Sequence, residues 1–242
     1  MESYRTRIYK QYAATFQDAK AEFDQQVADC LCRVIKYSFR GWWPQQQDAT
    51  IIDLACGGGK LLYCFKKQGF DNIAGVDISP DQVALSRQVT DDVTQANILD
   101  YLQEHKNSFD LITGIDIIEH FHKDEVLNFL DLCQAALKPD GRLILQTPNA
   151  DSPWGATLRY GDFTHEVCFN PNSLARLMKL SGFIKIESRE TGPVPFGYSF
   201  KSTVRYLLWQ SIRGLLMLWN IAETGSKGSG VFTRVFLISG TK

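Results

Sequence analysis

Apolar positions along the chain follow two periods, and the change from one to the other predicts the secondary structure. Short continuous apolar runs are separated by stretches in which apolar residues recur every three or four positions. The short runs indicate strands, and the periodic stretches indicate helices. The predicted strands are residues 50–54, 72–76, 93–98, 109–114, 142–147, 183–187 and 231–239, and the predicted helices are 60–68, 80–89, 124–137, 172–181 and 204–220.

Strands that alternate with helices in this way predict an α/β fold. A mostly parallel sheet covered by helices on both faces is the arrangement that such crossovers build. Ligands in these sheets bind beyond the carboxyl ends of the strands. We predict three parts: residues 1–44 as an N-terminal helical lid, residues 45–195 as the core, and residues 196–242 as an amphipathic helix with the final strand. Aromatic residues of the first part either cover a ligand or pack on the core.

A glycine-rich turn follows the first predicted strand. The sequence there reads Asp53-Leu-Ala-Cys-Gly57-Gly-Gly59-Lys, and the second strand ends at Asp77. Glycines allow a sharp bend and a close approach to a ligand. An acid after the second strand suits the hydroxyls of a ribose. Asp53 would repel a pyrophosphate but suits a cationic ligand with an amino-acid end, which favours S-adenosylmethionine.

The segment from Asp53 to Asp77 resembles the binding motif of class I S-adenosylmethionine-dependent methyltransferases, and the resemblance extends over about residues 45 to 190. Ala55 departs from it, because the family usually has glycine there. The resemblance implies a Rossmann-like, seven-stranded, mostly parallel sheet whose last strand is antiparallel. It implies S-adenosylmethionine as cofactor and S-adenosylhomocysteine as product. The cofactor-binding residues it implies are Asp53, Ala55, Gly57, Gly59, Asp77, Ile78, Asn97, Ile98 and Ile115.

Two of these residues have an expected contact with adenine. Ile78 would pack on the face of the ring. Asn97 stands where relatives commonly have aspartate, and its amide oxygen can accept a hydrogen bond from the adenine amino group. The alternative is that Asn97 is an ordinary loop residue.

The fourth predicted strand ends in a cluster of polar residues that includes Asp116, Glu119 and His120. If Asp116 begins a helical turn, the other two share its face. The segment resembles the acid-x-x-Glu-His motif of ubiquinone-biosynthesis-type O-methyltransferases, some of which hold a metal there. Three interpretations stay open. His120 is a general base, with Glu119 beside it; or the three residues bind Mg²⁺ or Mn²⁺; or they form a polar helix cap.

The segment between residues 150 and 169 lacks clear periodicity and is long for a compact domain, which is typical of lids and binding loops. Its aromatic, acidic and arginine side chains suit a polar, hydroxylated substrate. The stretch Asp162-Phe-Thr-His165 resembles a segment of methyltransferases in bacterial glycan pathways, in which the histidine lies at the substrate pocket. His165 is therefore a second candidate base. The alternative is a loop histidine bonded to local backbone.

Residues 203–220 form a predicted amphipathic helix with two tryptophans. The segment 196–242 carries six basic residues and one acid. Amphipathic helices usually turn their apolar face to a core, so packing on the domain or on a second subunit is the expected arrangement. The alternative is a helix in a membrane interface, which the tryptophans and basic flanks suit.

Composition bears on the binding partners of the protein and on its cellular compartment. The net charge of −1 produces no field that favours nucleic acid. The six cysteines form no C-x-x-C pair and predict free thiols in a reducing, cytoplasmic compartment, with the inner membrane face as the alternative location. The N-terminus lacks the apolar core of a signal peptide.

The histidines favour an acceptor that must lose a proton. We therefore predict methyl transfer to a hydroxyl oxygen of a small molecule or glycan acceptor, as in lipopolysaccharide biosynthesis. The alternatives are N- or C-methylation, including that of a quinone precursor, and a non-catalytic adenosyl-binding partner subunit. The oligomeric state is not predicted.

Overall fold

The computed structural model describes residue 4, residue 8, and residues 22–195 and 198–242. Its first half contains α3 (Gln25–Ser38), β1 (Ile51–Leu54), α4 (Lys60–Lys67), β2 (Ile73–Asp77), α5 (Pro80–Ser86), β3 (Val93–Gln95), α6 (Ile98–Glu104) and β4 (Phe109–Ile115). A short 3₁₀ helix, η1 (Ile118–His120), then precedes α7 (Lys123–Ala136), β5 (Leu137–Pro148), α8 (Gly155–Arg159), α9 (Pro171–Leu180), β6 (Ile184–Glu190), α10 (Phe200–Thr224) and β7 (Val235–Thr241).

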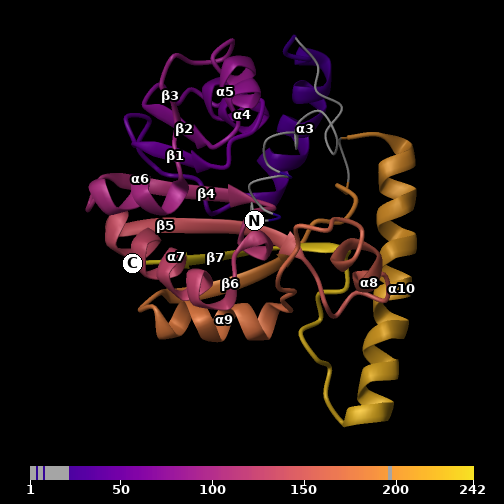
Figure 1. The fold of residues 1–242 in the computed structure, drawn as a ribbon. Coiled ribbons are helices and arrows are strands. Elements are labelled where there is room, and N and C mark those ends of the chain that lie inside the picture. The colour runs from indigo at the N-terminus through magenta and orange to yellow at the C-terminus, as the bar shows by residue number, and fades with distance from the viewer. Residues whose placement is uncertain (1–3, 5–7, 9–21, 196–197) are drawn as a thin grey trace.

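The strands form one seven-stranded sheet in the order β3-β2-β1-β4-β5-β7-β6 (Figure 1). β3, β2, β1, β4 and β5 are parallel, and β7 runs antiparallel to both β5 and β6. The predicted α/β fold, with a mostly parallel sheet, is therefore confirmed. The strand order reverses direction at β1 and β4, which is where such sheets bind ligands.

Helices cover both faces of the sheet because its central strands are apolar on both sides. All four residues of β1 are buried. One core contains Ile35 of α3, Phe65 of α4 and Val83 of α5. The other contains Phe129 of α7 and Leu174 of α9. This double burial explains why the strands read as continuous apolar runs rather than as alternating patterns.

Several predicted boundaries were wrong. The third strand ends at Gln95 rather than at residue 98, because Asn97 caps α6 through a 2.9 Å hydrogen bond from Leu99 N to its Oδ1. The final strand is Val235–Thr241 rather than 231–239, because its pairing with Arg142 and Ile184 fixes its end at Thr241. The segment 150–169, expected to be irregular, contains α8.

Two further predictions concern the N-terminal lid and the state of the cysteines. Residues 1–3, 5–7 and 9–21 of the predicted lid, residues 1–44, lie outside the described residues, and the lid stays a prediction. The prediction of free thiols was wrong for two cysteines: Cys32 and Cys64 form a disulfide, with their Cα atoms 5.0 Å apart. The packing of α3 against α4 brings them together, and a sequence separation of 32 gives no sign of it.

Candidate active site

The turn after β1 contains three residues with left-handed backbone. Ala55, Gly57 and Gly59 have φ values of 55°, 50° and 78°. A Cβ atom on Gly59 would also lie 2.9 Å from Ser86 Cβ of α5. Only glycine meets both demands at position 59. The left-handed conformation of Ala55 gives a physical reason for the glycine that the resemblance leads one to expect there.

Asp77 faces this turn from the end of β2. Its Oδ2 accepts a hydrogen bond from Gly57 N at 2.9 Å, and its Oδ1 accepts one from Ser79 N at 2.8 Å. Burial raises the pKa of this carboxyl, and the backbone hydrogen bonds oppose that effect. Each carboxylate oxygen can accept a second hydrogen bond, so the two oxygens of Asp77 can still accept hydrogen bonds from two hydroxyl groups.

Asp53 lies on the opposite side of the turn, within β1. Thr113 Oγ1 on β4 donates a 2.6 Å hydrogen bond to its Oδ1. Burial raises the pKa of Asp53 to about 7, the Thr113 bond opposes the rise, and the charge of Asp77 adds to it. A cationic group near Asp53 would favour its ionised form.

Two cavities meet at the glycine turn. One, of about 610 Å³, is lined by Asp53 and by Phe23 from the segment before α3. The other, of about 680 Å³, is lined by Asp77. Both volumes fall in the range of cavities that hold small-molecule ligands. The two share Ala55, Gly57, Gln82 and Ile115 in their walls.

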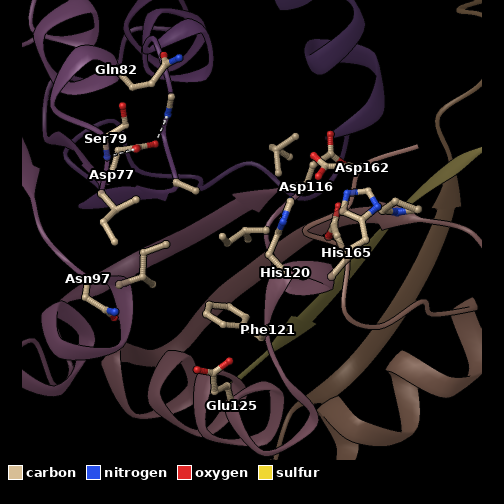
Figure 2. A pocket seen from close by; sticks show the side chains of 18 of the residues that line it. Asp77, Ser79, Gln82, Asn97, Asp116, His120, Phe121, Glu125, Asp162 and His165 are labelled. Carbon is tan, nitrogen blue, oxygen red and sulfur yellow. Dashed lines mark hydrogen bonds between the residues drawn. The ribbon is translucent and has the colours of Figure 1, made fainter. Parts of the chain in front are cut away.

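The larger cavity also brings together the expected adenine contacts. Ile78 and Ile98 line it together with Asp77 and Asn97, the last two of which are labelled in Figure 2. The side chain of Ile78 is 52% exposed, so a ring can reach it. The amide oxygen of Asn97 caps α6, as described above, so the adenine contact expected from it would have to use its second lone pair.

The chain leaves β4 through a left-handed residue and not through a helical turn. Asp116 has a φ of 53°, its N–H donates to Gln146 O at 3.0 Å, and its carboxylate accepts from Gln146 Nε2 at 3.2 Å. The condition under which Asp116 would share a helical face with Glu119 and His120 is therefore not met. The 3₁₀ helix η1 starts two residues later and carries Glu119 and His120.

A hydrogen-bonded chain holds His120. Thr164 Oγ1 lies 2.6 Å from Asp162 Oδ1 and 2.9 Å from His120 Nδ1. A carboxylate can only accept, so the threonine hydroxyl donates to Asp162 and accepts from Nδ1–H of His120. The neutral imidazole then carries its lone pair on Nε2, the nitrogen that can take a proton.

His165 lies against His120, with ring centroids 4.8 Å apart and the rings nearly perpendicular (Figure 2). Its Nδ1 is 3.0 Å from Leu158 O, and a carbonyl can only accept, so His165 too is protonated at Nδ1. His165 bonds local backbone, as the second interpretation expected, and it also lines the larger cavity. Its role as a base stays a prediction.

Glu119 is the buried member of this cluster, with 1% of its surface exposed. Thr147 Oγ1 donates to its Oε2 at 2.9 Å, and among the described residues its Oε1 has no hydrogen-bond partner. Burial raises the pKa of Glu119 to about 8, and the charge of Asp116 adds to the rise. The carboxyl is therefore largely protonated at neutral pH.

The metal site expected from Asp116, Glu119 and His120 does not form as a set. Within the described part of the chain, the group whose ligand atoms all lie within 4.8 Å of one another is Glu119, His120 and His165. Asp116 bonds Gln146 instead. Two imidazoles with one carboxylate suit a transition ion such as Mn²⁺ better than Mg²⁺, which prefers oxygen ligands.

Backbone contacts tie the 150–169 segment to this cluster. Glu166 N donates to Glu119 O at 2.8 Å, and the Arg159 guanidinium donates to the carbonyls of His165 and Glu166. His122, which the sequence places near His120, has its Nδ1 3.4 Å from Glu166 Oε2 instead. Sequence reasoning missed three threonines that organise the site, namely Thr113, Thr147 and Thr164; Thr164 stands inside the Asp162–His165 stretch that it had singled out.

Comparison with known proteins gives the class of protein that the sequence resembles, the methyltransferases. Residues 23–188 match the methyltransferase-domain family. A ubiquinone biosynthesis O-methyltransferase of Actinobacillus pleuropneumoniae is 33% identical over 109 residues, which cover 41% of this chain and 45% of that protein. One from Hydrogenovibrio crunogenus is 26% identical over 147 residues, or 58% of each chain. The chain thus aligns with about half the length of these relatives.

Solved structures share the fold. An S-adenosylmethionine-dependent methyltransferase from Archaeoglobus fulgidus superposes with a TM-score of 0.64 at 18% identity, covering 99% of this chain and all of the other. Phosphoethanolamine N-methyltransferase 2 of Haemonchus contortus, solved with S-adenosyl-L-methionine, gives 0.61 at 15% identity, covering 97% of this chain and 60% of the other. This chain belongs to the methyltransferase-domain family and has the class I S-adenosylmethionine-dependent methyltransferase fold.

Replacing Glu119 by glutamine should flatten the dependence of stability on pH. Because the native carboxyl titrates near pH 8 and the unfolded one near 4.5, the native state holds a proton that the unfolded chain releases. The free energy of unfolding should therefore fall from pH 5 to pH 8, and Glu119→Gln should remove about 1 kcal/mol or more of that fall.

Urea denaturation at both pH values, in buffer with EDTA, measures the difference. Asp53 titrates in the same window but is present in both proteins, so it cancels. Equal losses of stability from pH 5 to pH 8 in wild type and variant would contradict the raised pKa assigned to Glu119.

Proposed function

We propose that this protein transfers the methyl group of S-adenosylmethionine to a hydroxyl oxygen, with His120 as the general base. The observation that carries the proposal is the Asp162–Thr164–His120 chain, which puts the basic nitrogen of the imidazole on Nε2. His120 lines the same cavity as Asp77, the residue that we assign to the ribose.

The two cavities suit the two ends of the cofactor. We assign the ribose to Asp77 and the adenine to the wall formed by Ile78 and Ile98 in the larger cavity. The methionine end, with its ammonium, would lie toward Asp53 in the smaller cavity. The sulfonium would then lie near Ala55 and Gly57, which both cavities share, and its methyl group would face the histidine side.

The reaction then needs orientation and removal of one proton. Methyl transfer is a displacement in which the acceptor oxygen, the methyl carbon and the sulfur lie in line, and holding them there supplies much of the acceleration. An alcohol hydroxyl is a weak nucleophile until a base takes its proton, which typically contributes roughly 10²–10⁴-fold. Nε2 of His120 would take that proton, with the Asp162 carboxylate stabilising the imidazolium through Thr164.

The acceptor is proposed to be a sugar or another polyhydroxylated small molecule, such as a unit of a lipopolysaccharide or other glycan. Exposed aromatic side chains of the 150–169 segment, Trp154, Tyr160 and Phe163, support this choice because they offer flat apolar surfaces beside polar groups. The names of the curated relatives support oxygen as the accepting atom. Tyr4 lies edge-on to Phe163, with centroids 5.9 Å apart, which supports the proposed role of the N-terminal segment as a lid.

A divalent ion is compatible with the same residues. Glu119, His120 and His165 would hold it, and it would act as a Lewis acid on the acceptor hydroxyl. A metal-assisted mechanism differs from the base mechanism in one respect that can be measured, since EDTA would abolish the first and leave the second unchanged.

Asp77→Ala should weaken binding of S-adenosylmethionine and of S-adenosylhomocysteine by 10-fold or more, about 1.4 kcal/mol, because two hydroxyl hydrogen bonds are lost. Calorimetric titration measures both affinities. Asp81→Asn, which changes an exposed acid in the first turn of α5, is the matched control and should bind as wild type. Unchanged affinity in a folded Asp77→Ala protein would refute the ribose assignment.

His120→Ala should leave the affinity for S-adenosylhomocysteine within about twofold and lower turnover by roughly 10²–10⁴-fold, because the base is lost. Release of S-adenosylhomocysteine in the presence of sugar and catechol acceptors measures turnover, with and without EDTA. His165→Ala, made in parallel, should have the smaller effect. If His165→Ala is the more damaging change, the base assignment passes to His165.

Thr164→Val should lower turnover by about 10-fold or more at unchanged cofactor affinity, because His120 loses the contact that fixes its tautomer. Thr164→Ser keeps the hydroxyl and should restore turnover. A slow serine variant beside a valine variant that turns over as wild type does would mean that packing of the buried methyl group, and not the hydrogen-bonded chain, is what matters.

A further inference from the structure

The polar side of α10 faces the domain. Arg213 Nε donates to Gly230 O at 2.9 Å and lies 3.6 Å from Glu190 Oε2. Trp209 Nε1 donates to the same carboxylate oxygen at 2.9 Å, and the buried Ser202 donates to Val194 O at 2.6 Å. The expectation was packing of the apolar face on the domain or on a second subunit. Its first half was wrong, and its second half stays a prediction.

The apolar side of α10 faces outward. Eight large apolar residues, each between 39% and 84% exposed, form what we call the outer stripe: Phe200, Val204, Leu207, Leu208, Ile212, Leu215, Leu218 and Trp219. A contiguous apolar patch of this kind marks an interaction site on a water-exposed protein. Figure 1 shows α10 along one side of the domain, with its C-terminal end extending beyond the sheet.

The shape of the outer stripe fits a flat apolar surface. At 100° per residue the stripe covers an arc of about 140°, and its 25-residue helix is about 37 Å long. A seam between two helices is narrower than this. Among the described residues, no helix is long and apolar enough to cross a membrane. The helix would therefore lie along such a surface and not through it.

The charges around the stripe fit an anionic surface. Lys201 and Arg205 are exposed at its border, and Glu223 is the one acid in the sequence of α10. The carboxylate of Glu223 accepts a 3.1 Å hydrogen bond from Trp219 Nε1. Basic residues beside an apolar face and an exposed tryptophan characterise helices that lie in the headgroup region of a bilayer.

We propose that the outer stripe docks on a bilayer that contains anionic phospholipid, with α10 lying in the plane of the interface. The apolar side chains enter the acyl boundary, and Lys201 and Arg205 contact lipid phosphates. The proposal rests on α10 alone and does not depend on the assignment of the reaction.

Co-sedimentation of the whole protein with vesicles tests the proposal. We expect binding to mixed phosphatidylglycerol–phosphatidylcholine vesicles and at least about 10-fold weaker binding to phosphatidylcholine alone. Leu208→Glu with Leu215→Glu should weaken binding by 10-fold or more, because 60% and 67% of these side chains are exposed and would be inserted. Lys201→Glu with Arg205→Glu should remove the preference for anionic vesicles.

Leu180→Glu is the matched control, because Leu180 of α9 is 72% exposed and lies outside the stripe. It should bind vesicles as wild type does. Circular dichroism and binding of S-adenosylhomocysteine confirm that each variant is folded. Wild-type protein that ignores anionic vesicles would overturn the proposal. A dimer in sedimentation that only the Leu208→Glu, Leu215→Glu variant dissociates, without vesicle binding, would assign the stripe to a second copy of this chain.

Discussion

The left-handed turn between β1 and α4 is the constraint on which the site depends. Three residues with positive φ within five positions send the chain from the sheet into α4 at an angle that ordinary residues resist. Gly59 lets α4 approach Ser86 of α5, and the same bend presents Gly57 N to Asp77. The turn thus fixes the carboxylate beside it and forms the wall shared by the two cavities. Without it the two cavities would not meet.

The second half of the site is held differently, by hydrogen bonds that cross between segments. Glu119 binds the backbone of the 150–169 segment through its carbonyl, while its side chain is buried beneath the histidines. Asp162 and Thr164 of that segment reach back to His120. The segment and η1 therefore stabilise each other, and a change in the position of either one alters the hydrogen bond at Nδ1 of His120. This mutual support explains how an irregular segment can hold a geometry that catalysis requires.

Much of this could be predicted from the sequence, and the parts that could not have a common physical cause. The alternation of strands and helices, the glycine turn and Asp77 are local signals, readable from a few consecutive residues. The left-handed Asp116, the facing of Thr164 toward His120 and the Cys32–Cys64 disulfide depend on contacts between residues far apart in sequence. The orientation of α10 belongs with these. The helical wheel of α10 is amphipathic, but the side that faces the domain is set by contacts with Glu190 and Gly230. The periodicity of the helix sequence does not reveal these contacts.

The position of β7 also sets an order of assembly. Among the described strands β6 pairs with β7 alone, and β7 begins 45 residues after β6 ends, with the whole of α10 between them. During synthesis, the parallel part of the sheet can form while β5 has an open edge and β6 is still unpaired. The exposed leucines of α10 are therefore made before the strand that closes the sheet. A nascent chain in this interval presents apolar surface and an open strand edge together, which makes it a target for chaperones or, where a membrane is near, for early capture by lipid.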